Sequence, residues 1–531
     1  MKRFKKTGWL WAGLALILMA GTYLRLVNLV DSAYNAIEIP TVFNAHTNYV
    51  GEESLSQPAG NLQDFIFSKV IQYSYTVFGE NELAARSVNI VIGGMLVIMM
   101  FFIGWRFFHK GNAGIIAAFI TAFHPMLIDF SRIATIHNSR FFLLTFLVYA
   151  FYEGIEGTRD KHPGLLAQKA KLRKFYVFWN LDLFWLAVAV ITFWSTRLVF
   201  PRIDTLLFGL SAYCIVLFLM QFVYTIPKAG LKWKYGVLLI VLLVSIAFLK
   251  WNVSPIYGAD VLKNAFTPGE MVDTIFLHPS NWTLTAFALI GGVYTIINMQ
   301  KPGFYILTIF ISSLILAHFQ ARIDDYFFIF PLYLALATYG VFEFAYYIRR
   351  QLDVQLITVN IERRLHITPQ RLVMGFFLAI VILTSPWFRS ALDWNQKNTL
   401  LYGHVPMIEW KQIGEYLRQN QTADEPVVTP NPLLTRYYGL NGKYYQIDVD
   451  ALSNESIGDS LHVHDALHIS TIDEFKQVVA EYEIGWLVLE ESLRSEILIL
   501  QFINASGASH QLEKKFETPR KTAQVYSWRR I

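Results

Sequence analysis

Long apolar segments separated by short polar ones occupy the chain from about residue 9 to residue 388. A membrane-spanning helix needs about 20 mostly apolar residues. Eleven segments meet this requirement. They are roughly 9–30, 87–107, 113–130, 139–155, 178–196, 204–225, 235–251, 282–299, 303–320, 326–348 and 371–388. The pattern predicts an all-α polytopic membrane domain over residues 1–388.

From about residue 389 the pattern changes, because polar residues, proline and glycine become more frequent and no spanning run remains. Amphipathic periodicity and capping residues predict helices over 409–420, 431–439 and 470–482. Short apolar runs predict strands over 426–429, 444–448 and 484–490. Helices that alternate with strands are typical of an α/β fold. We therefore expect a second, α/β domain over residues 389–531.

The composition agrees with a membrane protein. Of the 531 residues 54% are hydrophobic and only 16% are charged, whereas soluble proteins average about 25% charged residues. This excludes a disordered chain and makes an ordinary soluble enzyme a poor fit. The single cysteine, Cys214, forms no internal disulfide and gives no information on redox compartment.

Lysine and arginine are unevenly distributed between the two sides of the predicted membrane domain. They concentrate in 1–6, 106–112, 156–177, 228–234 and 349–371. Cytoplasmic loops carry such an excess. We therefore expect a multi-pass protein of the plasma (inner) membrane with a cytoplasmic N-terminus and an extracytoplasmic C-terminal domain. The net charge of +5 then reflects orientation in membrane lipids, and no nucleic-acid partner is expected.

The first outer loop, 31–86, is long and acidic, and its apolar, aromatic part 64–78 is too short to span a bilayer. The latter predicts a helix lying at the membrane surface. Around this loop, three stretches follow one another in a characteristic order. They are Tyr23-Leu24-Arg25-Leu26 with Glu38 shortly after it, Phe78-Gly79-Glu80-Asn81-Glu82-Leu83-Ala84-Ala85-Arg86, and His124-Pro125-Met126-Leu127-Ile128-Asp129-Phe130-Ser131-Arg132.

This order resembles the GT-C membrane glycosyltransferases of family 39, which include the protein O-mannosyltransferases and the bacterial aminoarabinose transferases of lipid A. The resemblance covers residues 9–155 and continues more loosely to 388, where Arg322–Pro331 is similar to a stretch at the start of a late span. It implies transfer of a sugar from a polyprenyl-phosphate donor to a hydroxyl of a protein, lipid or glycan acceptor, with inversion at the anomeric carbon. It implies no cofactor and requires no metal.

Such a transfer needs a base near the acceptor and cations near the leaving phosphate. The family has an Asp-Glu pair in this loop, and the matching residues here are Ile37 and Glu38. The resemblance thus makes Glu38 the predicted general base. The missing aspartate leaves alternatives open: another acid replaces it, catalysis is lost, or Glu38 is a solvated loop acid. The replacement acids are Asp31, Asp64 and Asp129.

Arginine stabilises a phosphate through charge-assisted contacts. Arg132 and Arg322 are the residues predicted to hold the phosphate, with Arg86 and Lys69 in reserve. Tyr326, His137 and Asp64 complete the predicted substrate-binding set. The alternatives are that the basic side chains reach the interface from span ends, that Arg86 pairs with a loop acid, and that His137 is a surface-loop histidine.

Two other functions remain open on the sequence. A catalytically silent GT-C-like scaffold subunit of a membrane complex is favoured by the loss of the aspartate before Glu38. A transporter of lipid-linked sugar predicts broken spans at matching positions of two halves, and the sequence has no such symmetry.

Overall fold

The structure is a computed structural model of the 531-residue chain. It describes residues 2–27, 29, 33–35, 37–50, 62–108, 110–156, 177–178, 181–199, 203–223, 230–252, 268–298, 301–320, 323–351, 376, 379–392, 399–400, 405–422, 424–440, 442–447, 466–469, 471–490, 500–502 and 510–531.

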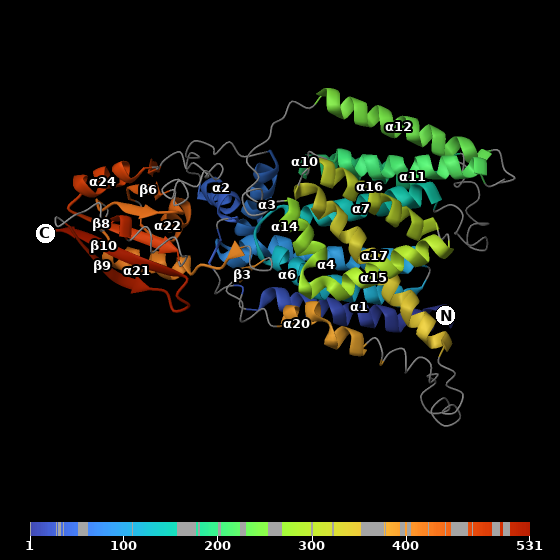
Figure 1. The fold of residues 1–531 in the computed structure, drawn as a ribbon, viewed down its shortest axis with the longest axis horizontal. Coiled ribbons are helices and arrows are strands. Elements are labelled where there is room, and N and C mark those ends of the chain that lie inside the picture. Colours follow the sequence, from blue (N-terminus) through green and yellow to red (C-terminus); the bar gives the residue numbers. More distant parts are fainter. Residues whose placement is uncertain are drawn as a thin grey trace.

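Helices make up the N-terminal part, and Figure 1 shows most of the long ones lying roughly along the long axis of the molecule. Before the first short strands they are α1 (Lys2–Leu26), α2 (Ile39–Val50), α3 (Leu62–Phe78), α4 (Glu82–Phe107), α5 (Gly111–Phe123), α6 (Pro125–Arg132) and α7 (His137–Glu156). After the hairpin of β1 (Val177–Phe178) and β2 (Leu181–Asp182) come α10 (Leu183–Val199), α11 (Asp204–Val223), α12 (Gly230–Asn252), α14 (Pro268–Val272), α15 (Trp282–Asn298), α16 (Lys301–Gln320), α17 (Ile323–Gln351) and α20 (Pro386–Leu392). A π-helical turn (Asp273–Leu277) and a 3₁₀ turn (Pro279–Asn281) join α14 to α15.

Within the described residues, five helical segments are long and apolar enough to cross a membrane. They are Gly8–Leu26, Glu82–Phe107, Pro279–Asn298, Lys301–His318 and Ile329–Ile348. The pair α5 and α6, bent by 57° at their junction, makes a sixth if it is one span. The described parts of α10, α11 and α12 are apolar but shorter. The eleven-span arrangement therefore stays a prediction.

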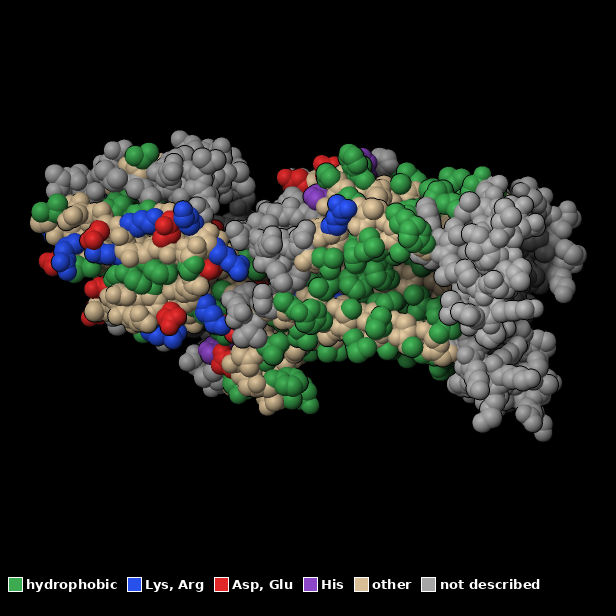
Figure 2. All heavy atoms as spheres, turned by 90° about the horizontal axis from the view of Figure 1, so that it is seen from below, with side chains coloured by type: hydrophobic (Ala, Val, Ile, Leu, Met, Phe, Trp, Pro, Cys, Tyr) green, Lys and Arg blue, Asp and Glu red, His purple; other side chains and the backbone are tan. Residues whose placement is uncertain are grey.

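Apolar side chains are exposed along the helices, as a lipid-facing surface requires. Trp9, Leu16, Val91, Ile191 and Leu289 are each more than half exposed. In Figure 2 hydrophobic side chains gather over the helical part, while lysines, arginines and acids are scattered over the C-terminal part. On this face the surface of the helical part is therefore more apolar than that of the C-terminal part.

Glycine lets α15 and α17 approach each other closely. A Cβ atom at Gly340 would lie 1.8 Å from the carbonyl oxygen of Phe287, and one at Gly291 would lie 2.2 Å from that of Leu336. Small residues at a crossing are the usual means by which membrane helices pack, because water is not present to drive side-chain burial.

The C-terminal part is built on a six-stranded sheet of order β7-β6-β5-β8-β10-β9. The strands are β5 (Val427–Thr429), β6 (Tyr444–Ile447), β7 (Leu467–Ile469), β8 (Ile484–Glu490), β9 (His510–Glu517) and β10 (Ala523–Arg530). The first four neighbours run parallel, and β10 and β9 add antiparallel. A small hairpin of β3 (Thr399–Leu400) and β4 (Val405–Pro406) precedes the sheet.

Helices cover both faces of this sheet. Helices α21 (Trp410–Asn420) and α22 (Pro432–Tyr438) pack on one face, and α24 (Ile472–Glu481) packs on the other. The predicted helices and strands of this region are confirmed within two residues at each end. Capping residues predicted the helix over 470–482, and the structure confirms such a cap, since Thr471 and Glu474 form a capping box at the start of α24. β7, β9 and β10 were not predicted.

One hydrophobic core joins the first outer loop to the C-terminal sheet. Residues of α2 and α3, such as Val42 and Ile71, share a buried cluster with Trp410, Leu434 and Trp486. Figure 1 shows α2 and α3 between the sheet and the helical part. The predicted helix at 64–78 is confirmed as α3, and its place at the membrane surface stays a prediction.

Candidate functional site

The first outer loop enters α2 through a reciprocal cap. Asn35 Oδ1 accepts hydrogen bonds from the backbone N–H of Ile37 (3.0 Å) and of Glu38 (3.1 Å). In return, Glu38 Oε2 accepts one from the backbone N–H of Asn35 (3.0 Å). This is the pattern of a capping box, in which two residues three apart satisfy each other's backbone donors.

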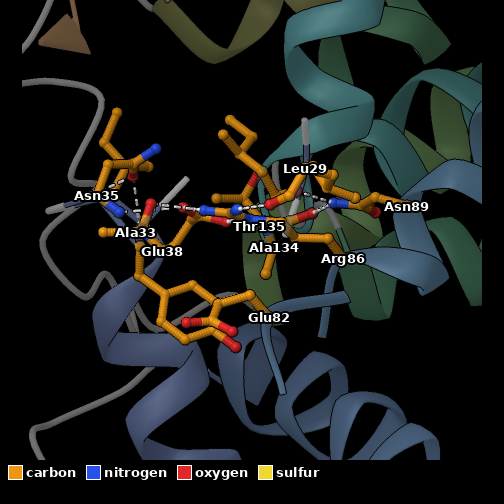
Figure 3. Close-up of polar contacts among 12 residues, drawn as sticks. Leu29, Ala33, Asn35, Glu38, Glu82, Arg86, Asn89, Ala134 and Thr135 are labelled. Carbon is orange, nitrogen blue, oxygen red and sulfur yellow. Dashed lines mark hydrogen bonds and ion pairs between the residues drawn. The ribbon is translucent and has the colours of Figure 1, made fainter. Parts of the chain in front are cut away.

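The Glu38 carboxylate is completely buried and paired with Arg86 from α4 (Figure 3). Arg86 Nε lies 2.8 Å from Oε1, and Nη2 lies 2.8 Å from Oε2. The backbone N–H of Ala134, between α6 and α7, donates to Oε1 at 2.7 Å. Four donors from three parts of the chain therefore converge on one carboxylate, with the two-pronged geometry that makes arginine pairs strong.

Arg86 also fixes the path of the loop before Glu38. Its Nη1 donates to the carbonyl of Leu29 (3.1 Å), and its Nη2 donates to that of Ala33 (2.8 Å). The Tyr34 ring lies over the guanidinium, 5.1 Å from its carbon. Of the two roles left open for Arg86, the structure shows the pair with a loop acid.

Arg25 and Arg132 form a second buried group beside this pair. Arg132 Nη1 donates to the carbonyls of Leu24 (3.1 Å), Arg25 (3.2 Å) and Val27 (2.8 Å), where α1 ends. Arg25 reaches the other way and donates to Ser131 Oγ (3.1 Å) on α6 and to the Ala122 carbonyl (3.0 Å) on α5. A cation at the carboxyl end of a helix is favourable, so Arg132 stabilises the end of α1.

Asn89 on α4 holds the segment that carries the Ala134 N–H. Its Nδ2 donates to the carbonyls of Ile133 (2.5 Å) and Thr135 (2.6 Å), while Asn138 Nδ2 donates to the carbonyl of Asn89 (2.7 Å). The labelled residues of Figure 3 show this segment lying next to Arg86. The position of the donor to Glu38 is thus fixed by a side chain of the same helix that supplies Arg86.

The other predicted site residues are dispersed. Lys69 is exposed on α3 and donates to Asn48 Oδ1 (2.9 Å) and Gln72 Oε1 (3.1 Å). His137 is buried, not in a surface loop, and its Nδ1 lies 3.3 Å from Arg140 Nη1. Tyr326 and Asp129 are buried in the helical part. Arg322 and Asp31, together with the side chain of Asp64, lie outside the described residues.

Sequence reasoning did not identify Asn35, Asn89 or the Ala134 N–H as part of this site. A signal for Asn35 was present, because Asn-x-x-Glu before a helix is a capping-box pattern. No local signal existed for Ala134, whose contribution is a backbone N–H brought close by the fold.

Comparisons with known proteins bear on this site. A family model described as dolichyl-phosphate-mannose-protein mannosyltransferase matches residues 65–168. Among solved structures, ArnT from Cupriavidus metallidurans bound to undecaprenyl phosphate is similar with a TM-score of 0.57 and 11% identity, over 98% of both chains. The resemblance to the GT-C membrane glycosyltransferases is confirmed. The apo state of the same ArnT gives a TM-score of 0.54 and 12% identity over 98% of both chains.

The GT-C fold is also shared with a second class of enzyme. An Archaeoglobus fulgidus oligosaccharyltransferase, solved in complex with Zn and sulfate, is similar with a TM-score of 0.51 and 13% identity, over 97% of this chain and 72% of that chain. A comparison with curated protein sequences gives no match. At these identities the likeness establishes the fold and not the reaction.

Proposed function

We propose that this protein is a membrane glycosyltransferase that moves a sugar from a polyprenyl-phosphate donor to an acceptor hydroxyl on the extracytoplasmic face. The observation that supports this most is the end-to-end GT-C fold, similar over 98% of both chains to an ArnT bound to undecaprenyl phosphate. The family model that matches residues 65–168 supports it independently from the sequence. The acceptor hydroxyl belongs to a protein, a lipid or a glycan.

In this reaction the bond between the anomeric carbon and the phosphate oxygen breaks, and a bond to the acceptor oxygen forms. The acceptor proton passes to a base, and polyprenyl phosphate leaves with the electron pair. Buried cations near the leaving group stabilise its charge. Arg132 and Arg322 remain the proposed phosphate ligands. Arg132 lies beside the Glu38–Arg86 pair, where it donates hydrogen bonds to the carbonyls at the end of α1.

The role of Glu38 as the general base stays a prediction. Its hydrogen bonds determine what would have to change for it to accept a proton. Its carboxylate accepts four hydrogen bonds, two from Arg86 and one each from Asn35 and Ala134. A base must lie within hydrogen-bond reach of the proton that it removes. Glu38 therefore acts as a base only in a state where one of these donors gives way to the acceptor hydroxyl.

The same geometry favours a second candidate, a catalytically silent GT-C scaffold subunit. Ile37 stands where the family has an aspartate, and Glu38 is engaged as a capping and pairing residue. Under this proposal the fold is kept for assembly and no sugar is transferred.

The deciding experiment has a binding arm and a transfer arm. The full chain in lipid nanodiscs is incubated with undecaprenyl phosphate, and binding is measured by native mass spectrometry. Membranes that contain the protein are then given undecaprenyl-phosphate-linked sugars labelled in the sugar, one with mannose and one with an amino sugar. Transfer of label to a protein, lipid or glycan fraction is expected. Lipid binding without transfer from either donor favours the scaffold.

A further inference from the structure

A polar cavity of about 730 Å³ lies where the first outer loop meets the C-terminal sheet. Its walls come from α2, the turn between α3 and α4, and helices α21 and α22. The size is within the range of small-molecule sites, about 300–1,000 Å³. This cavity is separate from the buried Glu38–Arg86 pair, and neither residue lines it.

Acids and bases are balanced on the described cavity walls. Three carboxylates face three side chains that are always cationic at neutral pH, and they are Glu80, Glu82, Glu415, Lys411, Arg418 and Arg436. Lys411 Nζ lies 2.9 Å from Glu82 Oε1. A phosphate or another polyanion needs an excess of cations, and a polycation needs an excess of acids. The balance instead suits a neutral ligand that both donates and accepts hydrogen bonds.

One wall presents a preformed acceptor group framed by aromatic rings. Glu80 Oε1 lies 2.6 Å from His46 Nδ1 and accepts a hydrogen bond from the Tyr437 hydroxyl (3.2 Å). The His46 and Tyr437 rings meet edge to face, with centroids 5.7 Å apart. The carboxylate is thus held in place, yet its side chain remains 28% exposed. A carboxylate accepts hydrogen bonds from the hydroxyls of a sugar ring. An aromatic ring beside the carboxylate packs against the apolar face of the same sugar.

The cavity is connected to the Glu38–Arg86 pair through one buried ring. Tyr34 meets Tyr437 edge to face at 5.5 Å, and the Arg86 guanidinium lies 5.1 Å from the centre of the Tyr34 ring. The Tyr34 backbone N–H donates to the Tyr438 hydroxyl at 2.8 Å. A ligand that contacts Tyr437 therefore lies one side chain away from the residues that hold Glu38.

The geometry points to a binding site for a neutral carbohydrate in this cavity, formed jointly by the first outer loop and by helices α21 and α22, which cover the C-terminal sheet. The carbohydrate chemistry rests on the cavity alone. That the bound carbohydrate is part of the acceptor rests on the proposed function, and it narrows the acceptor to a glycan or a glycan-bearing molecule.

Binding is tested with the full chain in nanodiscs and no donor present. The probes are mannotriose, maltotriose and chitotriose, with inorganic phosphate as a separate arm, and the readout is saturation-transfer NMR. Glu415→Gln replaces one acceptor oxygen with an amide nitrogen, and Tyr437→Phe removes a hydroxyl. Both changes leave the shape of the side chain nearly the same. Glu513→Gln is the matched control, because Glu513 lies on β9 and its side chain is 59% exposed outside the cavity.

At least one trisaccharide is expected to bind, and each cavity variant to weaken it by about 5- to 10-fold, with the control unchanged. The inference is overturned if no trisaccharide binds, if phosphate binds in their place, or if both cavity variants bind as the wild type does. A trisaccharide that binds here but receives no sugar in the transfer assay overturns only its assignment as acceptor. Transfer without any binding here overturns the site and leaves the proposed function standing.

Discussion

At the scale of single residues, the buried carboxylate of Glu38 has several partners at once. Glu38 is a capping residue for α2, the ion-pair partner of Arg86, and the acceptor for a backbone N–H between α6 and α7. A buried charge pair stabilises little by itself, since both groups lose water, but breaking it leaves an uncompensated charge. Residues 35, 38, 86 and 134 therefore act as one unit.

A double-mutant cycle separates pairing from catalysis. Glu38→Gln leaves Arg86 buried without its counter-charge, and we expect a loss of about 3–5 kcal/mol in stability. Adding Arg86→Gln removes both charges and is expected to recover a large part of that loss. Thermal unfolding in detergent, followed by tryptophan fluorescence, measures both effects.

The transfer assay on the same variants then tests the base. If Glu38 removes the acceptor proton, the double variant folds but transfers no sugar. Recovery of transfer along with stability means that the carboxylate only positions the loop. Lys476→Ala, at an exposed position of α24, is the control and is expected to match the wild type in both measurements.

Glu490 gives a pH dependence in the C-terminal sheet. It ends β8 and accepts a hydrogen bond from Asn431 Nδ2 (2.7 Å), and burial raises the pKa of its carboxyl above 4.5. A raised pKa means that the folded state binds the proton more tightly than the unfolded chain does. The stability that the folded protein gains from the protonated Glu490 carboxyl is therefore fully present below about pH 4.5. It is lost as pH rises through the folded-state pKa.

Glu490→Gln keeps the acceptor for Asn431 but cannot ionise. We expect the variant to be more stable than the wild type at pH 7 and equally stable near pH 4. Thermal unfolding across this range measures the difference. If the unfolding temperatures of the two proteins differ by the same amount at every pH, the pH dependence does not come from Glu490.

At the scale of elements, close helix crossings determine how the spans pack. The backbones of α15 and α17 approach so closely at Gly340 that a methyl group would overlap the Phe287 carbonyl. Helix α4 carries a glycine of the opposite kind, since nothing lies within 4 Å of a Cβ atom at Gly94.

Gly340→Ala is accordingly expected to force the two helices apart and to reduce the yield of folded protein several-fold. Gly94→Ala, the same chemical change in an open place, is expected to leave the yield unchanged or slightly improved. Size-exclusion chromatography in detergent compares the two. Equal behaviour of both variants means that the crossing tolerates a side chain.

The elements also show which sequence signals were sufficient. The helices α21, α22 and α24 were predicted because periodicity and caps are local properties. The same kind of signal located the five apolar helical segments that are long enough to span. β9 and β10 were missed: β9 carries many charged residues, and its burial alternates only weakly. Its place at the edge of the sheet depends on pairing with β10, which no local pattern reveals.

At the scale of the whole molecule, the C-terminal sheet is not an independent appendage. Its α21–α22 face shares a buried core with α2 and α3, and the polar cavity opens between them. The N-terminus and the C-terminus lie at opposite ends of the long axis (Figure 1). This arrangement suits the proposed topology, with a cytoplasmic N-terminus and an extracytoplasmic C-terminal part.

Cysteine labelling tests that topology directly, because Cys214 is the only cysteine and is buried. In a Cys214→Ser background, Asp473→Cys places a thiol on exposed α24, where the side chain is 92% exposed. Asn112→Cys places one at an exposed position in the first turn of α5. A membrane-impermeant maleimide is expected to label position 473 in intact cells, and position 112 only after permeabilisation. The reverse pattern contradicts the topology.

The sequence by itself determined the properties that depend on near neighbours: apolar segments long enough to span, an α/β pattern after residue 389, and an acidic residue soon after the first span. Only the tertiary structure decided the partners of that acid. Arg86 and Ala134 lie 48 and 96 positions away along the chain, and their approach follows from how α4 and the α6–α7 segment pack. A charge in the sequence is compatible with water, a substrate or an ion pair, and burial in the folded protein is what selects among them.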